Sequence, residues 1–454
     1  MSRIAPVLLG LALASSAAAA PGDAGHPLLH QISGEVREAQ LRATISTLVG
    51  FGTRHTLSDT RSQTRGIGAA RRWVQAQFQA LATACSGCLE VATPSQTVTG
   101  DRVPTPTEIV DVLAVQRGSG DPGRVVVISG HLDSRVSDPM NATSDAPGAN
   151  DDGSGVAAVM EAARVLSAHK FDATIVYAVL SGEEQNLYGG RLLAAYAKQQ
   201  GWRVEAQLNN DIVGNSHGQS GVVDASHVRV FSEGTRATET PEEAARRRYN
   251  GGEVDSPSRN LARFIAPLAD RYVPGLSVSM VYRTDRYSRG GDQVPMLEAG
   301  FPAVRLTEAA ENYSRQHQDV RTEGGIAYGD VISGVDFAYL TKVARLNAVS
   351  LAALALAPAP PAGVKIEGAV SADTKVSWTA SPDAAAYKVW WRSTIDPQWR
   401  FSRPADAQTS TTLKGLVIDD WFFGVSAVSA DGYESPIEFP GPAGAFFSAP
   451  AAHP

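Results

Sequence analysis

The 454-residue chain has only two cysteines, which excludes a fold held together by several disulfides. It also has no block of like charge, because 40 lysines and arginines are spread among 47 aspartates and glutamates. A surface for nucleic acid or for an anionic membrane would need such a basic block, so we expect neither partner. With 43% hydrophobic and 19% charged residues, the chain can instead bury a large core in more than one domain.

A long hydrophobic run is lacking at the N-terminus, where the apolar stretch covers only Ile4 to Leu13. A stretch of this length is too short to span a bilayer. It follows the positive residue Arg3 and ends in alanine-rich sequence through Ala20, a pattern that is typical of a secretory signal peptide. We expect residues 1–20 to be removed and the mature chain to be exported, periplasmic or secreted, with no transmembrane segment.

The two cysteines lie in one short unit, Cys85-Ser86-Gly87-Cys88, which follows a helical stretch from Ala69 to Ala84. A thioredoxin-like redox pair would stand at the start of a helix after a strand, and a zinc knuckle would need two more such ligands. We therefore interpret the pair as structural and favour a local disulfide that closes a turn. The spacing by itself leaves open whether the bond forms.

Hydrophobic periodicity predicts an α/β region that covers most of the chain. Residues 28–84 read mostly as helices, and from about residue 107 buried strand-like runs alternate with amphipathic helical stretches. The expected strands cover residues 109–115, 125–129, 173–180, 204–208, 277–281 and 303–306. The expected helices cover residues 154–168, 187–199, 256–272 and about 330–356. This alternation predicts a mostly parallel central sheet with helices on both faces, and places the functional site at the carboxyl ends of the strands.

An Ala/Pro-rich linker at residues 357–363 separates this first domain, residues 21–356, from a second domain at residues 364–445. The second domain contains short strand-like runs at sandwich-like spacing, around residues 376–378, 387–390, 411–413 and 423–428. It resembles a fibronectin type III domain, with Trp378 at the position of the second-strand tryptophan. Trp421 stands where that family usually has a tyrosine, so the corner of the sandwich must be held differently.

Acidic and histidine residues follow several of the expected strands. His131 and Asp133 end one run, Asp151 and Asp152 lie among glycines before a helix, Glu183 and Glu184 end another run, and Asp211 follows a third. Such side chains can converge at one edge of a parallel sheet and hold metal ions. Each pattern alone has a plain alternative, namely a surface ion pair for the first and a helix cap for the second. The paired glutamates at a buried strand end, however, need a metal ion or protons nearby.

Among nine histidines, His317 is the best further candidate, because Asp319 is close enough in sequence to support its ring. His55 is the chief rival, and we interpret it as structural or as lying near the substrate. Asp151 could bridge two ions, one oxygen to each, at the ~3.5–4 Å separation that two-metal aminopeptidases use.

Together, the motifs around these residues are similar to the ordered signature of the di-zinc exopeptidases of the bacterial leucyl aminopeptidase type (peptidase clan MH, family M28). The resemblance spans residues 45–350 and rests on Gly130-His131-Leu132-Asp133-Ser134, on residues 148–155, 182–184 and 210–214, and on His317. It implies two Zn²⁺, one held by His131, Asp151 and Asp211 and the other by Asp151, Glu184 and His317. It further implies Glu183 as the general base, Asp133 as the partner of His131, and a cis peptide bond after Asp151. Where the family shows Ser-Asp-His, this chain has Gly291-Asp292-Gln293, which leaves Asp292 for a supporting role.

The resemblance implies an aminopeptidase that acts on peptides with a free N-terminus. A carboxypeptidase or dipeptidase is an alternative, since Arg286 and Arg289 could pair with a substrate carboxylate, although both read more readily as surface arginines. A glutaminyl cyclase with one metal ion, or a metal-free binding protein of the transferrin-receptor kind, would use the same scaffold. The second domain could bind substrate, a surface or a partner through Trp391 and Trp399, unless these aromatic rings are packed.

Overall fold

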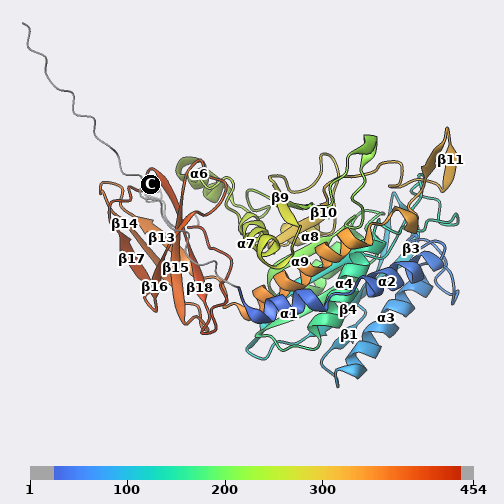
Figure 1. Ribbon diagram of the computed structural model, residues 1–454, viewed down its shortest axis with the longest axis horizontal. Coiled ribbons are helices and arrows are strands. Elements are labelled where there is room, and N and C mark those ends of the chain that lie inside the picture. The colour runs from blue at the N-terminus through green and yellow to red at the C-terminus, as the bar shows by residue number, and fades with distance from the viewer. Residues whose placement is uncertain (1–24, 441–454) are drawn as a thin grey trace, which may run out of the picture.

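The computed structural model describes residues 25–440, which form an α/β part and, beside it, a smaller all-β part (Figure 1). The predicted signal peptide, residues 1–20, and the end of the predicted second domain, residues 441–445, lie outside this range.

The α/β part is built on an eight-stranded sheet with the order β1-β4-β6-β5-β7-β10-β8-β9. Its strands are β1 (Glu90–Ala92), β4 (Val112–Gln116), β5 (Asp121–His131), β6 (Ala173–Leu180), β7 (Arg203–Asn210), β8 (His227–Phe231), β9 (Ser277–Val281) and β10 (Ala303–Glu308). The central strands β6, β5, β7 and β10 run parallel. At one side β4 pairs antiparallel with β6 and β1, and at the other β8 pairs antiparallel with β10 and parallel with β9. The predicted mostly parallel sheet is confirmed, with antiparallel strands added toward its edges.

Helices cover both faces of this sheet because its central strands bury side chains on both sides. In β5, Val126 and Ile128 join the larger core cluster, while Val125 and Val127 join the smaller cluster on the opposite face. The larger cluster includes side chains of α1 (Pro27–Glu35), α2 (Glu38–Gly50), α3 (Gly66–Ala84), α4 (Gly153–Leu166), α7 (Pro257–Tyr272) and α9 (Phe337–Leu356). The smaller one includes α5 (Tyr188–Gln199) and α8 (Gln293–Glu298).

Helix α9 is the one helix of the described residues that is long and apolar enough to cross a membrane. In the structure 83% of its apolar window is buried, against α1, α4, α7 and the sheet. Its composition is therefore explained by its position in the core.

The remaining elements lie outside the main sheet. They are the hairpin β2 (Ser95–Gly100) and β3 (Val103–Val110), the hairpin β11 (Arg321–Glu323) and β12 (Ile326–Tyr328), the helix α6 (Pro241–Asn250), and the 3₁₀ turns Gln219–Gly221 and Ile332–Gly334. Short elements of this kind carry little periodicity, and the sequence did not predict them as separate units. The expected strand 109–115 is in fact split at Asp111, whose carboxylate accepts a hydrogen bond from Ser181 N.

The last expected helix begins later than predicted. Residues 330–336 form a connection that contains the 3₁₀ turn Ile332–Gly334, and α9 starts at Phe337, where the Asp336 side chain accepts a hydrogen bond from Tyr339 N and caps the helix. Near the other end of the chain, Cys85 and Cys88 form a disulfide directly after α3.

The all-β part contains two three-stranded antiparallel sheets, β13-β14-β17 and β16-β15-β18. The strands are β13 (Ala362–Glu367), β14 (Thr374–Thr379), β15 (Ala386–Ser393), β16 (Phe401–Asp406), β17 (Ser410–Leu413) and β18 (Trp421–Val428). Both sheets contribute to one core, in which Val376 and Trp378 face Val389 and Phe423. We call this unit, residues 362–440, the C-terminal sandwich.

The C-terminal sandwich is joined to the α/β part by a buried ion cluster. Asp255, just before α7, accepts hydrogen bonds from Arg392 at 2.7 and 2.8 Å and from Arg263 at 2.8 Å. Trp399 is also packed at this junction, where its indole N–H donates to Asn260 at 3.1 Å. Trp391 stacks on Phe401 within the sandwich, so neither tryptophan projects freely into solvent.

Candidate metal centre

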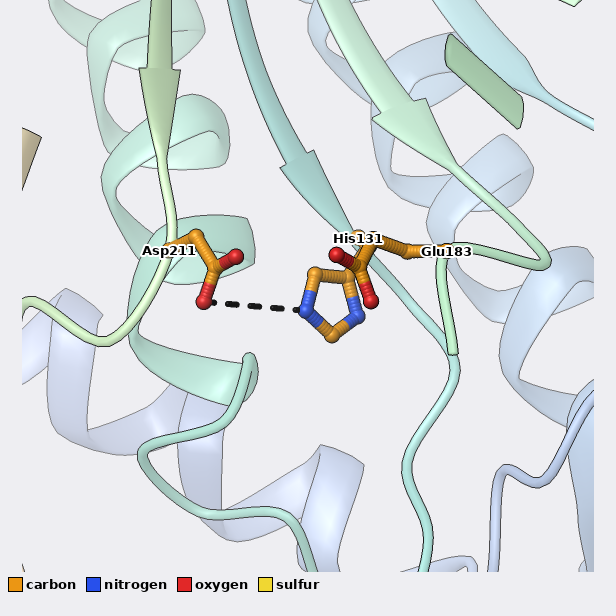
Figure 2. A group of neighbouring side chains, drawn as sticks. All are labelled: His131, Glu183 and Asp211. Carbon is orange, nitrogen blue, oxygen red and sulfur yellow. Dashed lines mark ion pairs between the residues drawn. The ribbon is translucent and has the colours of Figure 1, made fainter. Parts of the chain in front are cut away.

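Three neighbouring parallel strands deliver the predicted site residues. His131 is the last residue of β5, Glu183 and Glu184 follow β6, and Asp211 directly follows β7. Figure 2 shows His131, Glu183 and Asp211 turned toward one another beyond the strand ends. Because the carboxyl ends of parallel strands meet at one edge of the sheet, residues eighty positions apart come into contact here.

Asp151 lies between two histidines. Its Oδ1 is 3.2 Å from His131 Nε2, and its Oδ2 is 3.0 Å from His317 Nε2. His131 Nε2 is also 3.9 Å from Asp211 Oδ1, and His317 Nε2 is 3.0 Å from Glu184 Oε1. All five predicted ligands thus come together, and one carboxylate separates them into two groups.

The loop that carries Asp151 is fixed by its neighbour Asp152. The Asp152 carboxylate accepts hydrogen bonds from Gly155 N and from His131 N, both at 2.9 Å. Asp152 is therefore the helix cap, and Asp151 is left to face the histidines across a cis peptide bond. Gly155 is needed at this helix start, because a Cβ there would overlap the Asp152 carboxylate and the Asn210 carbonyl.

The arrangement offers two sets of donor atoms that could each hold an ion. His131, Glu183 and Asp211 place one donor each within 4.8 Å of one another, and so do Asp151, Glu184 and His317. Mixed imidazole and carboxylate donors suit zinc. Asp151, Glu183, Glu184 and Asp211 place four carboxylates in the same small space, so a divalent cation would supply positive charge that the site needs.

Asp133 supports the site differently from a simple carboxylate–histidine pair. The Asp133 backbone carbonyl is 3.0 Å from His131 Nδ1, whereas its Oδ1 lies 3.7 Å away. The carboxylate accepts hydrogen bonds from Gly182 N at 2.8 Å and from Glu184 N at 3.1 Å. Asp133 therefore orients His131 through its main chain and the two glutamates through its side chain.

The electrostatics of the site follow from charge crowded into a buried space. Burial lowers the pKa of His131, but the carboxylates of Asp151 and Asp211 outweigh this effect, so the pKa lies well above its ordinary value. Burial likewise opposes protonation of His317, yet Glu184 and Asp151 raise its pKa to about 10. A cation that binds to these rings would have to displace protons, so its affinity should depend on pH.

Glu183 differs from the other carboxylates. Burial raises the pKa of Glu183 well above its ordinary value, His131 opposes this shift, and the nearby charges of Asp211 and Glu184 add to it. A carboxyl group with a raised pKa is suited to accept and return a proton near neutral pH.

Two arginines pair with Asp211, and the sequence analysis did not recognise this role for either of them. Burial would raise the pKa of Asp211, but the Arg305 guanidinium, 2.9 Å away and fully buried, brings it far below its usual range. Arg286 lies 3.9 Å from Asp211, and its side chain is only 9% exposed, so its interpretation as a surface arginine was wrong. Arg289 is 33% exposed and pairs with Glu311 at 3.2 Å. Arg305 lay in an apolar strand, where its charge was the only signal.

The two residues that the sequence left undecided lie beside the site without joining it. Both ring nitrogens of His55 are engaged, Nε2 near Pro139 O at 2.9 Å and Nδ1 accepting from Leu57 N at 3.0 Å, which agrees with a structural role. Asp292 is buried, and one of its oxygens accepts from Gly190 N at 3.0 Å. Burial raises the pKa of Asp292 to about 7.

Known proteins are similar to this chain in sequence. The family described as Peptidase family M28 matches residues 111–323. A probable zinc metalloprotease of Pyrenophora tritici-repentis is 44% identical over 428 residues, which cover 93% of this chain and 88% of that protein. Another, of Leptosphaeria maculans, is 45% identical and covers 90% and 95% of the two chains.

Solved structures share the fold at lower identity. The LapA aminopeptidase of Legionella pneumophila is 20% identical, with a TM-score of 0.53 over 72% of this chain and 74% of that one. A leucine aminopeptidase precursor of Bacteroides thetaiotaomicron is 14% identical, with a TM-score of 0.50 over 70% and 97% of the two chains. The motifs, the arrangement of the site and the close relatives agree, and the chain belongs to peptidase family M28.

Proposed function

We propose that the protein is an exported aminopeptidase that holds two zinc ions and hydrolyses the N-terminal peptide bond of peptides. The observation that carries this proposal is the position of Asp151, whose two oxygens face two histidines at 3.2 and 3.0 Å. A carboxylate placed in this way can serve two ions at once. The names of the relatives, probable zinc metalloproteases, support zinc as the metal.

In this proposal, His131, Asp151 and Asp211 would hold one zinc, and Asp151, Glu184 and His317 would hold the other. Bound zinc supplies a water molecule of lowered pKa and an electrophile for the carbonyl oxygen of the substrate. Arg305 keeps Asp211 ionised, and Asp133 keeps His131 and Glu184 in place, so these residues prepare the site before substrate arrives.

Glu183 is the proton carrier. Its carboxylate accepts a proton from the attacking water as the oxygen bonds to the peptide carbonyl carbon. When the carbon–nitrogen bond breaks, Glu183 returns that proton to the leaving amine, so the residue ends the cycle as it began. Its proximity to His131 and Asp211 and its raised pKa support this role.

Hydrolysis at the carboxyl end of a peptide is a second candidate. It is favoured by one observation, a buried nitrogen of Arg286 that has no hydrogen-bond partner within the described part of the chain. A guanidinium near a metal site can receive a substrate carboxylate. The solved structures of similar fold that are called aminopeptidases favour the first candidate.

The deciding experiment supplies the mature protein with aminoacyl-p-nitroanilides and with peptides blocked at either end, and determines its zinc content. We expect about two zinc ions per chain and cleavage of substrates with a free amine, lost on chelation and restored by zinc. Cleavage of only those peptides that have a free carboxylate would replace the first candidate by the second, and cyclisation of N-terminal glutamine with about one zinc would indicate a glutaminyl cyclase.

We further propose that the C-terminal sandwich is a fibronectin type III-like domain and that residues 1–20 direct export. The two antiparallel sheets of the sandwich, which share one core, support the assignment as a fibronectin type III-like domain. N-terminal sequencing of protein recovered from the periplasm or medium of an expressing bacterium tests the second.

A further inference from the structure

The connection between β10 and α9 carries two side chains that contact Asp151, one a histidine and the other an aspartate. One is His317, a proposed zinc ligand. The other is Asp330, which lies just after β12 and is only 6% exposed. The proposed ligand set does not include Asp330, and its burial requires an explanation, because a buried carboxylate is costly unless donors surround it.

The donors around Asp330 are main-chain amides of the loop that carries Asp151, residues 147–152, which we call the metal-binding loop. Its Oδ2 accepts from Asp151 N at 2.7 Å, and its two oxygens lie 2.9 and 3.0 Å from Asn150 N. Its own backbone carbonyl accepts from Ala149 N at 3.2 Å. Three consecutive amides of this loop therefore end on a single residue.

Other residues hold the same loop, but at different points. Arg54 donates to the carbonyls of Pro147 and Gly148 at 2.6 and 2.9 Å, before the acidic pair. Glu308 accepts from the Asn150 side-chain amide at 2.8 Å. Only Asp330, within the described residues, accepts the main-chain N–H of Asp151 itself.

The loop that provides Asp330 is closed on itself. Gly329 N donates to Ser314 O at 3.1 Å, and the hairpin of β11 and β12 lies between these two residues. His317 is therefore held in the same closed loop as Asp330. One segment therefore contacts Asp151 at two points. Asp330 accepts the hydrogen bond of its main-chain amide, and His317 Nε2 lies 3.0 Å from its Oδ2.

We infer that Asp330 is a positioning residue for the bridging carboxylate of Asp151, and that it sets the affinity for the ion shared by Asp151, Glu184 and His317. This inference rests on the proposed function, because it assumes that the site binds two zinc ions, one at His131 and the other at His317. Asp330 is not one of the proposed zinc ligands. It acts by fixing the backbone from which Asp151 extends, so that the carboxylate meets His317 in the right place.

The test replaces Asp330 by asparagine, which has the same shape. An asparagine oxygen in place of Oδ2 could accept from both amides, but the NH₂ group in place of Oδ1 would then face Asn150 N, donor against donor, and the loop must shift. The matched control is Asp336→Asn in the same segment. Asp336 caps α9 and accepts a hydrogen bond from Ser216, and it contacts none of the proposed ligands.

Zinc affinity is measured by competition with a chelator of known affinity, and the geometry of the site by the absorption spectrum of the cobalt-substituted protein. For Asp330→Asn we expect one of the two ions to bind about 10- to 100-fold more weakly, with an altered cobalt spectrum. For Asp336→Asn we expect a lower unfolding temperature but two ions of unchanged affinity. If Asp330 had a purely structural role, Asp330→Asn would also lower the unfolding temperature and leave the affinity for both ions unchanged.

Asp330→Glu is the companion variant, which keeps the charge and lengthens the side chain. If Asp330→Asn does not fold, the glutamate variant must show the selective loss of one ion, in smaller degree, for the inference to stand. Two ions bound as tightly as in the wild type by either folded variant would overturn the inference and leave the proposed function intact. If the wild type itself binds fewer than two ions, the proposed function fails, and the inference fails with it.

Discussion

At the scale of single residues, the adjacent glutamates after β6 have opposite environments. Glu184 lies 3.0 Å from His317 and belongs to one donor group, whereas Glu183 lies with His131 and Asp211 in the other. In the proposed function these neighbours in sequence have different roles, Glu184 as a ligand and Glu183 as a proton carrier. This division can be tested because it makes different demands on each side chain.

Glu183→Gln should retain both zinc ions and lose about 10²- to 10⁴-fold in kcat, since an amide cannot accept the proton of the attacking water. Glu184→Ala should instead lose zinc, because a ligand is removed. The measurement is kcat on an aminoacyl-p-nitroanilide together with zinc per chain after dialysis. Full activity in the first variant, or two tightly held ions in the second, would contradict the assignment.

Glu233 should make stability depend on pH without any part in the site. Burial raises the pKa of Glu233 to about 7, and an amide hydrogen bond from Ala237 and the charge of Arg236 oppose this only in part. The unfolded chain releases this proton near pH 4.5, so the folded state binds more protons between these two values. Stability is therefore lost as pH rises through this window.

Glu233→Gln keeps the shape and removes the charge. We expect it to match the wild type at pH 4 and to be more stable by about 1–3 kcal/mol at pH 8. Urea unfolding of both proteins at the two pH values checks this expectation. Equal stability of the two proteins at both pH values would show that folding does not raise the pKa of Glu233.

The site residues that periodicity helps to locate are those that directly follow apolar strands, because strand ends can be read from it; Asp151 and His317 were predicted instead from the residues around them and from the family resemblance. His131, Glu184 and Asp211 are of this kind. Asp330 and Arg305 could not be found in this way. Asp330 follows a short exposed hairpin, and Arg305 is buried within a strand, so their importance depends on contacts between distant segments.

At the scale of elements, strands and helices of the α/β core were predicted well because each buries a regular face. The prediction for residues 173–180 and 277–281 matches β6 and β9. It failed at element boundaries, as at α9, which was expected to begin at about residue 330 but begins at Phe337 after its cap Asp336. Both aspartates are plausible caps in sequence, and only the contact of Asp330 with the metal-binding loop distinguishes them.

The junction between α7 and β15 depends on the buried ion cluster of Asp255, Arg263 and Arg392. Asp255→Ala would leave two buried guanidiniums without their carboxylate and should cost about 3–5 kcal/mol in the free energy of unfolding. As a control, Arg400→Ala removes the exposed end of the Arg400–Asp396 pair, 63% exposed at the arginine, and should change little. Chemical denaturation of both variants gives the comparison, and a cost below 1 kcal/mol for Asp255→Ala would show that the cluster is weakly coupled.

At the scale of the whole molecule, the C-terminal sandwich is packed against the α/β part but contributes no residue to the metal centre. A chain that ends before β13 should therefore unfold at a lower temperature, because the contacts of Arg392 and Trp399 with α7 are lost. Its kcat/KM on small aminoacyl substrates should remain that of the full protein. Differential scanning calorimetry and steady-state kinetics at a temperature where both chains are folded test the two statements, and a large loss of activity would show that the sandwich shapes the site.

The packing of the sandwich has one more consequence. Within residues 25–440, strand β9 is the outermost strand at one side of the sheet, and its ladder partner is β8. The sandwich segment around Pro397 and Gln398 lies beside it, with hydrogen bonds from Tyr282 to Pro397 O and from Gln398 to Met280. An uncovered strand edge invites pairing with another molecule. Because the sandwich lies beside this flank, we expect a chain that lacks the sandwich to aggregate more readily at high concentration than the full protein.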